Sequence, residues 1–220
     1  MPQAVFEHLR PNLKTVNLVC QQVIYRVDTP VKHVYFIDRG LISLVKVMQD
    51  GRTVEIEALG IEGVTGTYSL YGIGCARFDV IVQIPGAALR IASSTLRSEV
   101  AKSEALQNLM QRYAFFAVTR LAQTAACNRL HPLKERCCRW LLIAHDNARS
   151  DSFPFTHEFL AMMLGVQRSG LSVTLGILEK AGLIHLARGR VTITDRSGLE
   201  AAACECYGSI RAQLDQLFRS

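Results

Sequence analysis

The 220-residue sequence lacks the segments that direct a chain to a membrane or across it. Its opening, MPQAVFEHLRPN, has no basic segment followed by an apolar core, so we expect no signal peptide. No apolar run approaches the roughly 20 residues that a membrane span needs. These absences predict a soluble, cytoplasmic protein with no membrane partner.

Motifs typical of common enzymes are also absent. The sequence has no Walker loop, no G-x-S-x-G and no H-E-x-x-H, and its six histidines are scattered. We therefore expect no enzyme, no catalytic residue and no cofactor.

The seven cysteines include no C-x-x-C pair, and their odd number argues against a disulfide framework. Free, mostly buried thiols and no metal site are the expectation for a reducing compartment. Two close pairs, Cys137-Cys138 and Cys204-x-Cys206, leave a redox or metal alternative open. The other cysteines are Cys20, Cys75 and Cys127.

Charge of both signs is present, with a formal net charge of +6, which suits a polyanionic partner without locating it. Residues 164–190 are more telling. They hold Arg168, Lys180, Arg188 and Arg190 against the single acid Glu179. This local excess of positive charge is typical of a nucleic-acid contact.

Four segments, 16–27, 33–48, 53–59 and 78–84, are rich in β-branched and aromatic residues and are separated by turn residues. This pattern predicts an antiparallel sandwich or barrel. The dipeptide Asp50-Gly51 between two apolar runs predicts a hairpin, because a tight primed turn needs positive φ angles.

From about Ser93 the pattern becomes helical, and residues 103–130 contain no proline or glycine. Apolar residues recur there at intervals of three and four, and a helix of roughly 26 residues would be close to 40 Å long. Because this helix is apolar almost all round near residues 113–118, we expect one face on the barrel and another on a second copy. The alternative is that the helix is buried within one chain. Three polar residues interrupt a strict heptad, so the residues of the dimer seam are not assigned. The polar residues are Arg120, Gln123 and Thr124.

His131-Pro132 breaks this helix, because proline cannot donate the helical hydrogen bond. An amphipathic helix over 133–148 follows, and 149–155 has the composition of a flexible loop.

The stretch THEFLAMMLGVQRSGLSVTLGILEKAGL predicts two short helices at a fixed angle. Thr156 is placed to cap the first, which ends at Leu164, and Gly165 can take the left-handed conformation of the turn. The second, from about Gln167 to Ala181, buries a leucine face and exposes polar residues at its start. Strands over 183–187 and 190–194, joined by Arg188-Gly189-Arg190, complete a winged helix-turn-helix. The buried leucines are Leu171, Leu175 and Leu178.

These motifs, in this order, resemble the Crp/Fnr family of bacterial transcription regulators from about residue 15 onward. The resemblance implies an α+β fold in three parts: an antiparallel, jelly-roll-like β-roll sensor over 1–103, a dimerisation helix over 104–130, and a winged helix-turn-helix domain over 131–220. Its implied function is sequence-specific binding of double-stranded DNA by a homodimer, and RNA polymerase is an expected partner.

Arg168 matches the family's base-reading arginine and could fork onto guanine O6 and N7. The family's usual glutamate and second arginine are replaced by Ser169 and Val173, so a different operator sequence is expected. Gln167, Ser169 and Ser172 are predicted to assist base contact. Phosphate contacts are predicted for Thr156, His157, Arg188 and Arg190.

The effector cannot be named from the sequence. The family's cyclic-nucleotide signature is incomplete, because Gly66 is followed by Thr67 and Arg77 by Phe78. Only Cys20 lies near the N-terminus, too few thiols for an iron-sulfur cluster, and a haem alternative would need Pro2 and Cys75. Tyr113 and Arg120 on the long helix are further effector candidates, and interface packing is the favoured interpretation of both. The switch is expected at residues 128–132. The rival hypothesis is a ligand-binding or thiol-redox sensor whose helix-turn-helix only packs.

Overall fold

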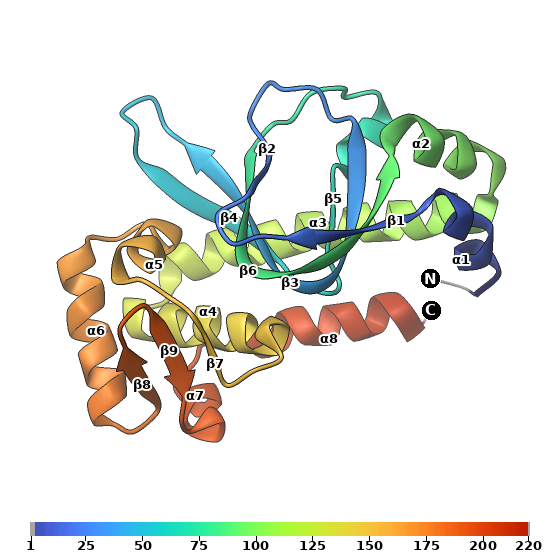
Figure 1. Ribbon diagram of the computed structural model, residues 1–220. Coiled ribbons are helices and arrows are strands. Elements are labelled where there is room, and N and C mark those ends of the chain that lie inside the picture. The colour runs from blue at the N-terminus through green and yellow to red at the C-terminus, as the bar shows by residue number, and fades with distance from the viewer. Residues whose placement is uncertain (1–2, 220) are drawn as a thin grey trace.

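The computed structural model describes residues 3–219 as a β-roll, one long helix and a smaller α/β half (Figure 1). In chain order the elements are α1 (Gln3–Leu9), η1 (Arg10–Asn12), β1 (Lys14–Leu18), β2 (Val23–Tyr25), β3 (His33–Val47), β4 (Thr53–Leu59), β5 (Val64–Thr65), η2 (Thr67–Tyr71), β6 (Asp79–Ala92), α2 (Ser93–Lys102), α3 (Glu104–Leu130), α4 (Leu133–Ala148), β7 (Ser152–Pro154), α5 (His157–Leu164), α6 (Arg168–Lys180), β8 (Ile184–Ala187), β9 (Arg190–Ile193), α7 (Arg196–Ala201) and α8 (Cys206–Arg219).

The β-roll is a six-stranded antiparallel sheet in which β1, β6, β3 and β4 are neighbours, while β2 pairs with β6 and β5 with β3. The expected hairpin is present between β3 and β4. Gly51 has φ +81°, and the backbone N–H of Met48 donates to the carbonyl of Arg52 at 2.8 Å. The sequence-based prediction of an antiparallel β-roll is confirmed.

Two strand predictions differ from the structure in length. The segment 16–27 divides into β1 and β2 because Gln21 adopts φ 63° and turns the chain. The strand predicted to end at residue 84 continues to Ala92, through Pro85 and Gly86. A Cβ at Gly86 would clash with the backbone of Arg39 on β3, so glycine here permits a close approach of two strands rather than a turn.

The long helix is confirmed as α3, of 27 residues. The Ser103 side chain caps it by accepting from the N–H of Leu106 at 3.3 Å, which separates α3 from the shorter α2. The helix ends at Leu130 with His131 as its C-cap, and Pro132 is the N-cap of α4, so the break predicted from the proline is confirmed.

The prediction of a flexible loop over 149–155 is wrong in part. Residues Ser152–Pro154 form the edge strand β7, which pairs with β9 in a three-stranded sheet ordered β7-β9-β8. Pro154 fits there because an edge position needs no further hydrogen-bond donor on its outer side.

The β-roll and the C-terminal half share one hydrophobic core. Leu41, Val45 and Ile84 of the roll belong to the same buried cluster as Trp140 of α4 and Leu160 of α5. Beyond this core, α8 folds back and packs on α3, so that the chain's last helix runs beneath the roll (Figure 1). The helix-turn-helix is thereby docked against the β-roll in this arrangement.

No single helix of the described residues is long and apolar enough to cross a membrane; α5 and α6 together pass by length and composition but are bent by 108°.

Candidate nucleic-acid interface

The turn between α5 and α6 gives the helix-turn-helix its geometry. The two helices meet at 108°, within the range of this motif. The Thr156 hydroxyl accepts from the N–H of Phe159 at 3.2 Å, and Gly165 takes φ +64°, so the predicted cap and the predicted left-handed turn are both confirmed. The predicted leucine face of α6 is fully buried. It consists of Leu171, Leu175 and Leu178.

The first turn of α6 is exposed and polar. Gln167 is the N-cap residue and makes no capping bond with its side chain, and Arg168 and Ser169 follow it on the surface. Among the described residues no hydrogen bond or ion pair engages the Arg168 guanidinium. The free N–H groups of a helix start favour anions, so this turn can receive a phosphate or present an arginine to a base edge.

Ser172 and His157 form a pair rather than two separate surface groups. His157 Nδ1 lies 2.9 Å from Ser172 Oγ, and both residues are half-buried where α5 meets α6. This bond occupies one ring nitrogen of the histidine, and among residues 3–219 no hydrogen bond engages Nε2. The hydroxyl of Thr156 is likewise committed, in its case to the helix cap.

An apolar residue on the exposed side of α6 was not assigned a contact from the sequence. Val173 has 66% of its surface exposed, and it lies five residues after Arg168. A methyl-bearing side chain on a recognition helix can contact the thymine methyl group. The missed signal is the helical spacing itself, which places Val173 on the side that does not carry the leucines.

The two arginines of the wing differ in whether they bond to other residues of the chain. Arg188 lies in the exposed β8–β9 turn beside Gly189, whose φ is +72°. Arg190 is on β9 and donates to Ser152 of β7, through Nε to the hydroxyl at 3.0 Å and through Nη2 to the carbonyl at 2.8 Å. Of these two arginines, Arg188 alone has no hydrogen bond or ion pair within the described part of the chain.

Arg120 on α3 is buried and points to the β-roll. Its guanidinium contacts Glu57 Oε1 at 2.6 Å and Glu62 Oε1 at 2.9 Å, and it also donates to the carbonyl of Ala58 at 3.1 Å. Burial alone would lower the pKa of Arg120, but the two carboxylates outweigh it and hold that pKa above its ordinary value. Arg120 thus joins α3 to β4 as a charged group.

Tyr113 lies seven residues before Arg120 on α3 and also faces the roll. Its hydroxyl donates to the carbonyl of Val64 at 3.1 Å and accepts from the N–H of Val64 at 2.7 Å. The Tyr113 hydroxyl therefore uses both its donor and its acceptor function within the chain. Its partner, Val64, lies two residues before Gly66.

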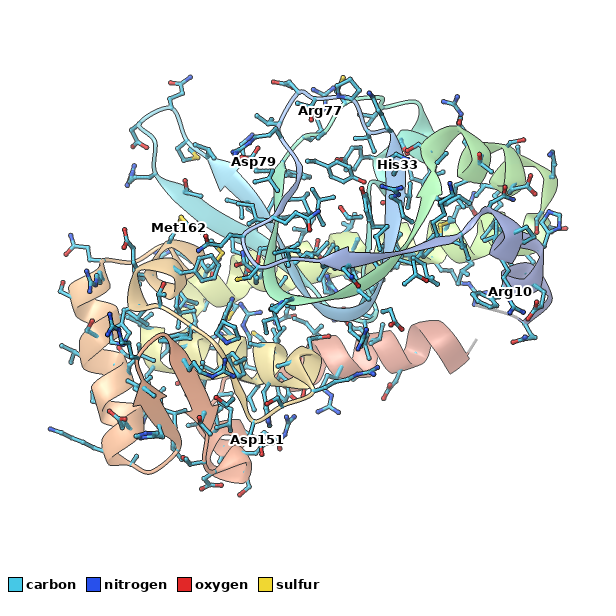
Figure 2. All side chains as sticks on the ribbon, in the orientation of Figure 1. Arg10, His33, Arg77, Asp79, Asp151 and Met162 are labelled. Atoms are coloured by element: carbon cyan, nitrogen blue, oxygen red, sulfur yellow. The ribbon has the colours of Figure 1, made fainter. Side chains whose placement is uncertain are left out.

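The remaining effector candidates lie on the loop side of the roll. Gly66 adopts φ +87° at the start of η2, and Thr67 is the first residue of that turn. Arg77 stands at the top of the roll, away from Met162 of the helix-turn-helix (Figure 2), and its nearest acid is Asp28 at 3.8 Å. Arg77 is therefore an exposed residue that is ion-paired within the roll. Of the two residues of the haem alternative, Pro2 lies outside the described residues.

A cavity of about 390 Å³ lies between the roll and the C-terminal half, beside the core that they share. Arg120, Trp140 and Arg211 are among the residues that line it, from three different helices. Glu55 on its wall accepts from Trp140 Nε1 at 3.1 Å and bonds the Ser43 hydroxyl. Burial raises the pKa of Glu55 to about 7, above its ordinary value.

Family models match both halves of the chain. Residues 15–103 match the cyclic nucleotide-binding domain, and residues 135–202 match the Crp-like helix-turn-helix domain. These two domains in this order, joined by a long helix, define a transcriptional regulator rather than an enzyme. The chain belongs to the Crp/Fnr family, as the resemblance of its motifs predicts.

Solved structures of that family have the same fold. FixK2 from Bradyrhizobium japonicum gives a TM-score of 0.72 at 16% identity, covering 87% of this chain and 98% of its own. TTHB099, a transcriptional regulator of the CRP family from Thermus thermophilus, gives 0.72 at 21% identity, covering 86% and 96%. The c-di-GMP-responsive global regulator CLP from Xanthomonas campestris gives 0.65 at 14% identity, covering 87% and 99%. No curated protein sequence gives a significant match.

Proposed function

We propose that this Crp/Fnr-family regulator binds pseudo-palindromic operators in double-stranded DNA as a homodimer. The observation that carries the proposal is the first turn of α6, where Arg168 is exposed and has no partner in the described chain. A buried or internally paired arginine would not be free to read a base. The proposed division of labour is a β-roll sensor over 1–103, a dimerisation helix over 104–130 and a DNA-binding domain over 131–220.

Base reading is proposed for one side of α6. Arg168 would donate two hydrogen bonds to a guanine, and Gln167 and Ser169 would bond neighbouring base edges. Ser172 would assist while held by His157, and Val173 would contact a thymine methyl group. The serine and valine replace charged residues of the family pattern, so the preferred half-site should differ from familiar operators.

Phosphate contacts are proposed around this helix. Arg188 in the wing would form an ion pair with the backbone, and His157 would use its free Nε2. Thr156 would contribute from its exposed position at the start of α5. Arg190 would contact phosphate through the donors that Ser152 leaves free.

Dimerisation is proposed through an exposed seam of α3. Gln111, Phe115, Val118, Ala122 and Ala125 are exposed or small and follow each other at intervals of four and three. That spacing is the heptad of a two-stranded coiled coil. A Val118→Asp variant should sediment as a monomer, because a charge in the seam is costly to bury; Glu104→Asp is the matched control outside the seam.

Regulation is proposed at the joint between the two halves. The cavity lined by Arg120 has the volume of a small-molecule site and touches the roll, α3 and α4. An effector bound there would shift the DNA-binding domain about residues 128–132, provided that it binds two orientations with different affinity. Gly66, Thr67, Arg77 and Tyr113 remain the alternative effector residues, and RNA polymerase is the proposed partner on DNA.

The first experiment is selection of bound duplexes from a random DNA pool by the purified protein without effector. A two-fold motif with half-sites about 10 base pairs apart would support the proposal, since two recognition helices of a dimer enter successive major grooves. Recovery of no motif by the wild type, with and without cell extract, would contradict it.

The rival is a ligand-binding or thiol-redox sensor whose helix-turn-helix only packs. The dependence of affinity on salt separates the two hypotheses, because each phosphate contact releases counterions and lowers affinity as salt rises. A negative slope that is smaller in Arg188→Ala favours DNA binding. Absence of measurable binding to any duplex at low salt favours the rival.

A further inference from the structure

Four potential metal ligands meet where the end of α3 touches the start of α8. Cys127 and His131 lie one helical turn apart, and Cys204 and Cys206 come from the segment that enters α8. Their ligand atoms all lie within 4.8 Å of one another. The three cysteines are buried, and His131 keeps 17% of its side chain exposed.

The spacing suits a single tetrahedral ion. Cys127 Sγ and Cys204 Sγ are 3.5 Å apart, and Cys206 Sγ is 3.5 Å from His131 Nδ1. Bonds of about 2.3 Å to sulfur and about 2.1 Å to nitrogen put neighbouring ligand atoms of a tetrahedral zinc site roughly 3.5–3.8 Å apart. An iron-sulfur cluster would hold its thiolates farther apart, because several metal atoms must fit between them.

The surroundings orient the ligands in the way that metal sites require. His131 turns Nδ1 to the thiols, while its Nε2 lies 3.1 Å from Glu205 Oε2. A carboxylate on the distal nitrogen fixes the tautomer of a metal-binding histidine. Gln123 Nε2 donates to Cys206 Sγ at 3.0 Å, which would stabilise a thiolate there.

The site also has a compensating charge. Three thiolates around a divalent cation leave one net negative charge. Arg139 is buried, acts electrostatically on Cys127 and Cys204, and its Nε has no hydrogen-bond partner in the described part of the chain. This buried cation would offset the net negative charge of the metal site.

We propose that Cys127, His131, Cys204 and Cys206 bind one Zn²⁺ ion, which fastens α8 to the C-terminal end of α3. Zinc takes such a Cys₃His set in closed structural sites, with no position left for water. The sequence predicted no metal site because the expected C-x-x-C pairs are absent. The ligands instead combine C-x-x-x-H with C-x-C, and 77 residues separate Cys127 from Cys204.

The position of the site gives it a consequence for regulation. His131 is the C-cap of α3 and precedes Pro132, at the hinge about which the DNA-binding domain is proposed to move. Zinc would fix one orientation of that hinge, and its removal would free α8 and loosen the domain. This consequence rests on the proposed function, whereas metal binding itself does not.

The test begins with untagged wild-type protein purified under reducing conditions, whose metal content is measured by mass spectrometry. We expect about one zinc per chain. After removal of zinc by a chelator, Co²⁺ should restore the visible d–d bands and the thiolate charge-transfer band of a tetrahedral sulfur-rich site. The zinc content and the Co²⁺ spectrum are both measured on the wild-type protein without DNA, so neither depends on whether a variant folds.

Variants then assign the ligands. Cys206→Ser should lose the charge-transfer intensity of one thiolate, whereas Cys137→Ala, an equally buried cysteine of α4, should keep the full spectrum and stoichiometry. Glu205→Gln should retain one zinc but bind it roughly 10-fold more weakly, as expected for a residue that positions a ligand.

Three results would overturn the proposal. The first is wild-type protein that contains no zinc and binds neither Zn²⁺ nor Co²⁺ more tightly than Cys206→Ser does. The second is a Cys127–Cys204 disulfide in protein isolated from cells supplied with zinc. It would lower the mass of the protein by two hydrogens. The third is an iron and sulfide chromophore. Loss of DNA binding with full zinc content would instead contradict the proposed function alone.

Discussion

Two arginines of this chain, Arg120 and Arg168, are used in opposite ways. Arg120 is buried on α3 and bonds two carboxylates and a carbonyl within the protein. Arg168 is exposed at the start of α6 and has no ion pair in the described residues. The first holds the β-roll on the long helix, while the second remains available to an outside partner.

The difference shows how a cation can be assigned to structure or to recognition. A buried ion pair is costly to form and more costly to break, because removing one partner leaves an uncompensated charge. An exposed arginine costs little to replace in the free protein. Substitutions at the two positions should therefore act on different observables, and the following predictions test that separation.

The largest effect should come from Arg120→Met. Glu57 would remain buried without its partner, so the free energy of unfolding should fall by about 3–5 kcal/mol. Urea denaturation measures it. Arg129→Met, an exposed arginine of the same helix, should change stability by less than about 0.5 kcal/mol, and equal losses in both variants would refute the distinction.

The second effect concerns Glu55, on the wall of the cavity beside Arg120. Burial raises the pKa of this carboxyl from 4.5 to about 7. The unfolded chain therefore releases the proton at lower pH than the folded chain. Stability from this group is present below about pH 4.5 and is lost as pH rises to about 7, by up to about 3 kcal/mol.

Glu55→Gln removes the titrating group and keeps an acceptor for Trp140. Its unfolding free energy should depend less on pH between about 5 and 8 than that of the wild type. Glu104→Gln, at an exposed site, serves as the control. If the unfolding free energy of the wild type, relative to that of Glu55→Gln, instead rises with pH across this window, the predicted direction of the Glu55 effect is wrong.

The third effect is on recognition. Arg168→Ala should lower discrimination between the selected operator and a base-substituted one by about 1–3 kcal/mol, without changing the unfolding free energy appreciably. Binding titrations on the two duplexes measure it. Lys180→Ala, in the last turn of the same helix, should leave discrimination intact; if it does not, the base-reading turn has been assigned wrongly.

The smallest effect should come from the wing. Arg188→Ala should weaken binding to all sequences alike and reduce the salt slope by about 0.9. Arg190→Ala should also act alike on all sequences but less strongly, because Ser152 already engages that guanidinium. A loss of sequence discrimination in either variant would mean that the wing reads bases.

Local patterns predicted the parts of the molecule that local forces determine. The cap at Thr156, the left-handed Gly165 and the end of α3 at His131 each depend on a few adjacent residues, and the structure confirms all three. The strand β7 was missed because its hydrogen bonds come from β9, more than thirty residues later. The sequence-based prediction of a loop rested on the composition of that segment alone.

The partners of buried polar groups could not be predicted for the same reason. The sequence marked Arg120 as a residue that disturbs the helical seam, and only the fold places Glu57 and Glu62 against it. The four residues of the proposed zinc site come from two distant segments. Nothing in the spacing of either segment indicates that they meet.

The contact between Gly165 and Val54 adds a thermodynamic consequence. A Cβ at Gly165 would lie 3.1 Å from Val54 Cγ2, so the turn of the helix-turn-helix fits closely onto strand β4 of the sensor. If the protein binds an operator and an effector as proposed, the two ligands would compete for, or share, one arrangement of this contact. Coupling between two ligands is reciprocal: an effector that tightens operator binding tenfold is itself held tenfold more tightly on the operator. An operator would in that sense regulate effector binding at the β-roll.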